Sequence, residues 1–166
     1  SGHFNLFTGA ATNGKGGDML LSIGSGTTFT GGDIVMSAGL STATSVGTGG
    51  AISVSTGISE PTTSGALIVK TPDAGTIGMS GALRFTSGTA SKGNSGYIQI
   101  ATGSATHGEG GDILVSIGKS KTNPGGDVVV TAGWSEPLSG GAISIASGEG
   151  TTDTSGAVIV KTINAG

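Results

Sequence analysis

One motif recurs along the whole chain at nearly constant spacing, and it constrains the fold more than any other feature. It consists of a glycine followed by apolar residues at the second and fourth positions after it. Eight of the ten intervals between motifs are 15 residues long, one is 16 and one is 18. Such a period indicates a tandem-repeat protein. The motifs begin at Gly2, Gly17, Gly32, Gly50, Gly65, Gly81, Gly96, Gly111, Gly126, Gly141 and Gly156.

The apolar residues within each motif alternate with other residues, which predicts a short strand with one buried face. Met19 and Leu21 show this alternation, and so do Ile113 and Val115. The segments between motifs are rich in Gly, Ser, Thr and Pro, so they predict turns and return paths. No segment has the periodicity of a helix.

A single strand in each repeat has no partner within that repeat, so we expect successive repeats to stack. Each strand would then pair in parallel with its equivalent about 4.8 Å away. The sequence therefore predicts an all-β fold, a β-solenoid (parallel β-roll or β-helix) of about eleven 15-residue rungs without helix. This single solenoid would occupy residues 1–166. A meander of antiparallel hairpins is the alternative, but a parallel stack better explains the identical orientation of every motif.

A longer repeat is superimposed on the short one. The segment TGAATNGKGGD at Thr8 matches TGSATHGEGGD at Thr102, and SGALIVKT at Ser64 matches SGAVIVKT at Ser155. We therefore predict a super-repeat of six rungs in residues 1–94, followed by five rungs of a second super-repeat in residues 95–166. Neither end has an evident cap, so we expect either a fragment of a longer array or rungs that join other copies head to tail.

The composition argues against several classes of function. The chain has 35 glycines, only 10% charged residues and a net charge of −3, so it offers no basic surface for nucleic acid. No apolar run approaches the roughly 20 residues that membrane insertion requires. No acid–base partner recurs beside the two histidines, His3 and His107, so we expect no enzymatic activity. The abundant Ser and Thr would allow O-linked glycans.

Four carboxylates form the clearest candidate for a ligand site. Asp18 and Asp33 occupy the same position in successive rungs, and Asp112 and Asp127 repeat this arrangement. Stacked carboxylates repel, so either calcium or hydrogen bonds from turn amides would be needed to hold them. The surrounding sequence resembles half of the repeat of calcium-binding β-rolls, although five of the eleven rungs have Ala where that family has Asp. We therefore expect no cofactor, with calcium at these four residues as the alternative.

The third position after the motif glycine carries recurring aliphatic residues on the nominally outward face. Adjacent exposed aliphatic residues usually mark a contact surface. We therefore predict that this surface contacts other copies of the chain, unless another layer of the same chain covers it. These residues are Leu20, Val35, Ile68, Leu114, Val129 and Ile159.

Two resemblances bear on function. The 15-residue rung is similar to that of β-solenoid antifreeze proteins, but residues such as Ile23 and Ala38 interrupt the rank of Thr that would bind ice. The repeats GGDIVMSAG and SGALIVKT resemble the Gly/Ser/Thr-rich tandem-repeat surface proteins of diatoms and related algae. That resemblance implies a structural protein that is extracellular or at the cell surface. We predict the building block of a filament or appendage that assembles by end-to-end and lateral β-sheet contacts, with an ice-binding or adhesive protein as the alternative.

Overall fold

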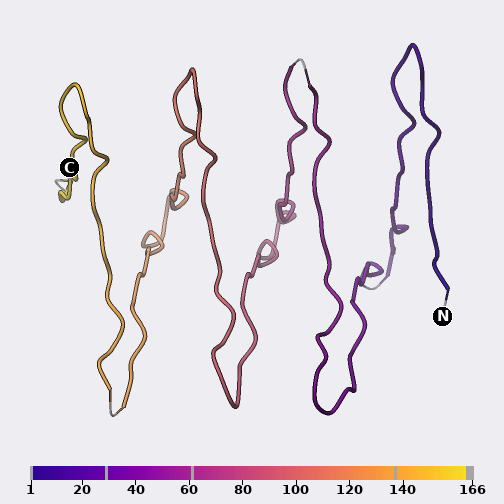
Figure 1. Cartoon of the computed structure of the whole chain (residues 1–166), viewed down its shortest axis with the longest axis horizontal. Helices are drawn as coiled ribbons and strands as arrows, with labels where there is room; N and C mark the ends of the chain where they lie inside the picture. The colour runs from indigo at the N-terminus through magenta and orange to yellow at the C-terminus, as the bar shows by residue number, and fades with distance from the viewer. Residues whose placement is uncertain (1, 29, 61, 137, 164–166) are drawn as a thin grey trace. The chain divides into compact units, whose positions relative to one another are not determined.

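The computed structural model describes the whole chain except residues 1, 29, 61, 137 and 164–166. The described residues contain no helix and no strand; they form extended segments separated by bends (Figure 1). Accordingly, none of them belongs to a helix that could cross a membrane. The chain divides into two units, Ser1–Leu83 and Arg84–Gly166. The outer ends of the predicted super-repeats, Ser1 and residues 164–166, lie outside the described residues.

The bends recur once in every repeat, and they lie in the Gly/Ser/Thr-rich segments that the sequence predicts as turns. Two of them end at a glycine with positive φ: Gly78 at +136° and Gly93 at +110°. Only glycine adopts such angles readily, because it has no Cβ. The bends include residues 12–14, 27–28, 44–46, 76–78, 91–93, 106–108, 121–123 and 151–153, together with residues 60, 62, 136 and 138.

Each bend lies in a loop whose two ends approach one another, and we call this closure the glycine neck. At each neck the first glycine of a repeat lies against the residue six positions after the preceding motif glycine. A Cβ added to Gly32, for example, would lie 2.6 Å from Cγ2 of Ile23. The ten necks are Thr8–Gly17, Ile23–Gly32, Ala38–Gly50, Thr56–Gly65, Thr71–Gly81, Ser87–Gly96, Thr102–Gly111, Ile117–Gly126, Ala132–Gly141 and Ser147–Gly156.

Backbone hydrogen bonds close four of these necks, two in each unit. In the first unit, the N–H of Gly50 donates to the carbonyl oxygen of Gly39 at 2.9 Å, and that of Gly65 donates to Gly57 at 3.0 Å. The equivalent necks of the second unit have the same bonds, from Gly141 to Gly133 at 2.9 Å and from Gly156 to Gly148 at 3.0 Å. No ladder continues from these bonds among the described residues.

The prediction of an all-β β-solenoid is therefore wrong for the described part of the chain. In that prediction the segments between motifs are return paths that could cover the strands as a second layer. These segments instead form loops whose apolar residues, such as Leu40, Ile58 and Trp134, are exposed and do not cover the extended segments. The chain reverses at the loops, as in the alternative of antiparallel hairpins, but the described segments form no paired strands either (Figure 1).

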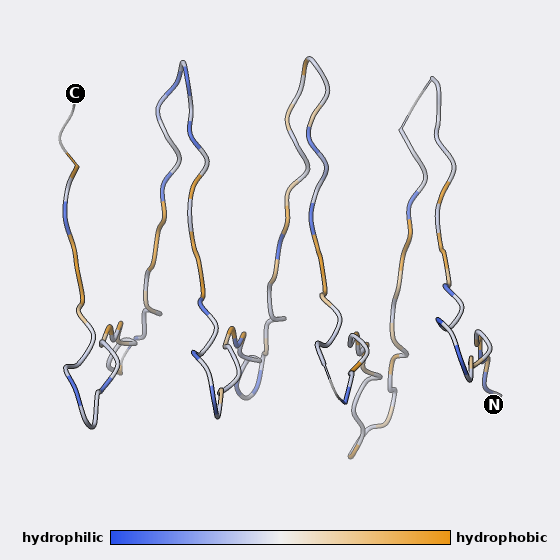
Figure 2. Cartoon of the chain, turned by 90° about the horizontal axis from the view of Figure 1, so that it is seen from above, coloured by the Kyte–Doolittle hydropathy of each residue, from blue (hydrophilic) through white to orange (hydrophobic). Residues whose placement is uncertain are grey.

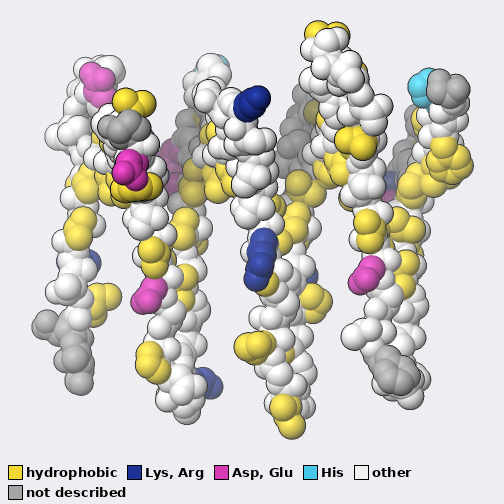
Figure 3. All heavy atoms as spheres, turned by 90° about the horizontal axis from the view of Figure 1, so that it is seen from below, with side chains coloured by type: hydrophobic (Ala, Val, Ile, Leu, Met, Phe, Trp, Pro, Cys, Tyr) yellow, Lys and Arg dark blue, Asp and Glu magenta, His cyan; other side chains and the backbone are white. Residues whose placement is uncertain are grey.

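The described residues also have no buried core. Ser59 and Thr71 are half-buried, and every other described residue is exposed. Apolar residues are concentrated in the extended segments, whereas the loops are mostly polar (Figure 2). Many of these apolar side chains are visible on the face drawn in Figure 3. The alternation that predicts a buried face is thus present, but the described part of this single chain leaves that face uncovered.

Candidate assembly surface

The six aliphatic residues at the third position are among the most exposed apolar side chains of the chain. Leu20 and Leu114 are 88% and 87% exposed, and Val35 and Val129 are 84% and 77% exposed. Ile68 and Ile159 are similarly open. Residues at the second position, such as Ile34 and Ile113, are 50–55% exposed. Fourth-position residues on that same face, such as Ile145 and Val160, are 75% and 91% exposed, so both faces of the segments are accessible to a partner.

The backbone of the extended segments is equally open. Folded proteins have roughly one internal hydrogen bond per residue, mostly between backbone groups. The described residues form only the four backbone–backbone bonds at the glycine necks. Most N–H and C=O groups of the extended segments are thus available to water or to another chain, which is the property that makes unpaired edge strands associate.

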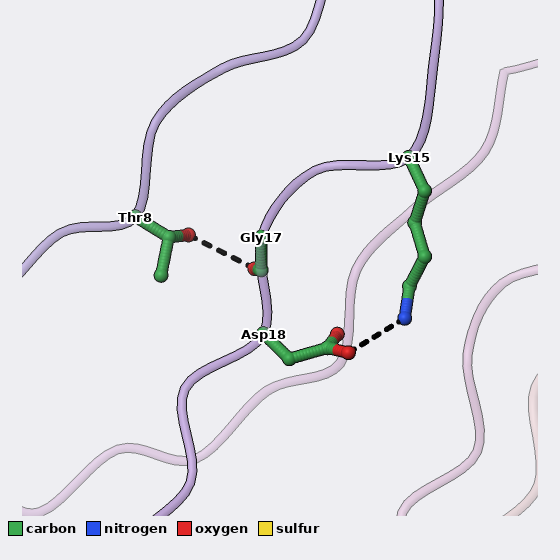
Figure 4. Close-up of polar contacts among 4 residues, drawn as sticks. All are labelled: Thr8, Lys15, Gly17 and Asp18. Carbon is green, nitrogen blue, oxygen red and sulfur yellow. Dashed lines mark hydrogen bonds and ion pairs between the residues drawn. The ribbon is translucent and has the colours of Figure 1, made fainter.

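Two of the four candidate calcium ligands, Asp18 and Asp33, lie in the first unit, and the other two lie in the second. Asp18 accepts a hydrogen bond from Nζ of Lys15 at 2.7 Å, and both side chains are about four-fifths exposed (Figure 4). Asp33, Asp112 and Asp127 have no ion pair in the described part of the structure. No group of three or more His, Asp or Glu residues within that part is arranged to hold a metal ion. The prediction that turn amides hydrogen-bond these carboxylates is not met at Asp18, whose partner is a lysine.

Sequence reasoning did not identify the contact partner of the motif glycine. The glycine marks the start of each repeat in the sequence. It closes the preceding loop, however, only through its contact with the residue six positions after the preceding motif glycine. One sequence signal could have indicated it. The motif glycine is often preceded by a second glycine, as in Gly31-Gly32 and Gly125-Gly126, and paired glycines are typical of close backbone approach.

Nothing in the described residues adds a catalytic arrangement to these surfaces. They enclose no pocket. His3 and His107 are both exposed. The features that remain are the exposed aliphatic face, the unpaired backbone and the repeated glycine necks. Comparison with known proteins finds no matching family model, no matching curated relative and no matching solved structure.

Proposed function

We propose that this protein is a structural tandem-repeat protein, the building block of an extracellular filament or cell-surface appendage. Copies associate laterally through their extended segments and end to end through their terminal repeats. The observation that carries this proposal is the exposure of the third-position aliphatic face along both units of the chain. The resemblance of the repeats to algal surface proteins supports the extracellular location.

The energetic argument starts from the composition. Hydrophobic residues make up 34% of the chain, yet none of the described residues is buried. Covering one Val, Leu or Ile side chain contributes about 1.5–3 kcal/mol. A single copy does not gain this energy, whereas a second copy laid against the extended segments would supply both an apolar cover and backbone hydrogen-bond partners. Association is therefore strongly favoured over the isolated chain.

Because the motif repeats, the free energy of association between two copies increases with the number of repeats in contact. Each additional repeat that is covered adds a similar small free energy, as in other repeat arrays. A contact that is weak at one segment thus becomes strong along a chain of eleven motifs. Exposed lysines such as Lys70 and Lys161 limit uncontrolled pairing, because charged side chains oppose the approach of another edge.

Electron microscopy and sedimentation of the purified chain over a concentration series test this proposal. We expect uniform filaments above a critical concentration, and we expect ammonium sulfate to lower that concentration because it strengthens apolar burial. Parallel samples with calcium and with a chelator show whether the carboxylates contribute. A chain that stays monomeric at every concentration would exclude self-assembly, and an ice-growth assay would then test the antifreeze alternative.

A further inference from the structure

The two super-repeats carry the same aliphatic residues at equivalent positions, which limits how two copies can align in parallel. Aliphatic side chains face each other when the copies align residue for residue. They also face each other when one copy is shifted by one super-repeat. The first register pairs six aliphatic residues in one contact and the second pairs three, but a shifted copy leaves its other three free for a further copy, so the apolar face alone does not choose between these two registers. The equivalent residues are Leu20 and Leu114, Val35 and Val129, and Ile68 and Ile159.

A three-residue insertion in one loop of the first super-repeat does not disturb the shifted register of the five rungs that both super-repeats contain. The loop from Gly39 to Gly50 is three residues longer than the loop from Gly133 to Gly141. Both loops nevertheless close with the same backbone hydrogen bond, at 2.9 Å in each. The extra residues are therefore contained beyond the neck, and the extended segments on either side keep their correspondence.

Charged residues differ between the super-repeats, and they do distinguish the registers. Lys15 in the first super-repeat corresponds to Glu109 in the second. Nζ of Lys15 lies 2.7 Å from Oδ2 of Asp18, so this loop contains one positive and one negative side chain. The equivalent loop of the second super-repeat has two carboxylates, Glu109 and Asp112, and neither forms an ion pair with another described residue.

Alignment residue for residue places all seven basic and all ten acidic side chains opposite their own copies. Like charges directly opposite one another destabilise paired segments. A shift by one super-repeat removes most of these contacts, because Ser25 faces Lys119 and Glu60 faces Thr151. Three like-charged pairs remain, and one attractive contact appears, between Lys15 and Glu109. The remaining like-charged pairs are Asp18 with Asp112, Asp33 with Asp127, and Lys70 with Lys161.

We propose that copies associate in parallel with a stagger of one super-repeat, so that the first super-repeat of one copy lies against the second super-repeat of the next. This inference rests on the proposed self-assembly and defines its register. Each staggered contact leaves one super-repeat of each copy free for a further copy. The contact is therefore heterologous and does not close, and it generates an open filament.

Charge reversal at the one attractive contact tests the stagger in the full chain. Sedimentation gives the critical concentration of four proteins: the natural chain, Lys15→Glu, Glu109→Lys and the double variant. Each single variant creates a like-charged contact in the staggered register, so we expect its critical concentration to rise about two- to tenfold at low salt. The double variant restores an attractive contact and should return to the natural value. In 1 M salt the four values should converge, because screening shortens the range of these forces.

A fifth protein, Lys70→Glu, separates this contact from a general effect of net charge. It changes the net charge by the same amount as Lys15→Glu, but it converts the repulsive pair of Lys70 and Lys161 into an attractive one. We therefore expect its critical concentration to fall below that of the natural chain.

The possible results discriminate clearly between the stagger and its competitors. Four equal critical concentrations would overturn the stagger and favour alignment residue for residue. Raised values for the single variants without rescue in the double variant would also overturn it, since local disruption of the two loops would then explain the data. If the natural chain itself fails to sediment at any concentration, the proposed self-assembly is wrong and the stagger falls with it.

Discussion

Ile23 and Gly32 form the tightest of the glycine necks: a Cβ placed on Gly32 would lie 2.6 Å from Cγ2 of Ile23. The equivalent contact of the second super-repeat, between Ile117 and Gly126, has a corresponding distance of 3.1 Å. These distances are shorter than ordinary van der Waals contact. At these two necks the closure of the loop therefore disfavours any residue larger than glycine at the start of the motif, whereas at others, such as Gly96, a Cβ would make only ordinary contact at 3.7 Å.

Substitution of Gly32 by Ala should open this neck. The added methyl group cannot be accommodated without displacing Ile23, and overpacking of this kind costs about 1 kcal/mol or more, which lowers the closed population roughly fivefold. The measurement is the nuclear Overhauser effect between the γ2 methyl group of Ile23 and the α protons of residue 32. Gly31→Ala is the matched control, because a Cβ at Gly31 meets nothing within 4 Å. Equal signals in the two variants would show that the neck does not depend on the glycine.

Hydrogen exchange should identify the four necks that are closed by backbone bonds. The amide of Gly50 donates to Gly39, whereas the neighbouring Gly49 has no such bond among the described residues. An exposed hydrogen bond contributes about 0.5–1.5 kcal/mol, so Gly50 should exchange roughly two- to tenfold more slowly than Gly49 after correction for sequence. Gly141 should show the same protection relative to Gly140. Indistinguishable rates within both pairs would argue that these bonds are not formed in solution.

The bend at residues 91–93 should depend on the positive φ of Gly93. An alanine at this position would be strained by about 1–3 kcal/mol, so Gly93→Ala should depopulate the bend. Three-bond coupling constants between the amide and α protons report φ directly. Gly88→Ala is the control, since its φ is not positive and a Cβ there meets nothing within 4 Å. A bend that survives Gly93→Ala with an unchanged coupling constant would contradict this prediction.

The sequence predicted the local features of this chain well and its tertiary structure wrongly. The bends fall where Gly, Ser and Thr are concentrated, because turn chemistry is a local property that residues such as Gly93 determine by themselves. The alternation of apolar residues is still visible in the exposure of Ile34 and Val35, at 50% and 84%. Burial, however, requires a second apolar layer, and the large apolar residues of the return segments, such as Leu40 and Trp134, are exposed and do not pack against the extended segments.

In the candidate site, too, features that depend on neighbouring residues could be predicted from the sequence, and contacts between residues far apart in the sequence could not. The third-position residues could be read from the repeat, and the structure leaves them exposed as an assembly surface requires. The pairing of Lys15 with Asp18 could also have been anticipated from their separation of three residues. The residue that each motif glycine contacts could not have been anticipated from sequence separation, because the contact spans a loop whose closure depends on backbone geometry. The function and its location remain predictions.

Polar substitution on the third-position face should weaken assembly while leaving the glycine necks intact. Val35→Ser combined with Val129→Ser removes one aliphatic contact from each super-repeat. Since covering a valine contributes at least about 1.5 kcal/mol, the critical concentration should rise by at least about tenfold. Ser53→Thr is a control at the same position of another motif, where the natural residue is already polar. Sedimentation measures the critical concentration, and the Ile23 to Gly32 contact reports the neck in the same samples. If the double variant assembles like the natural chain, the aliphatic face is not the surface through which copies associate, and the exposed backbone of the segments becomes the stronger candidate.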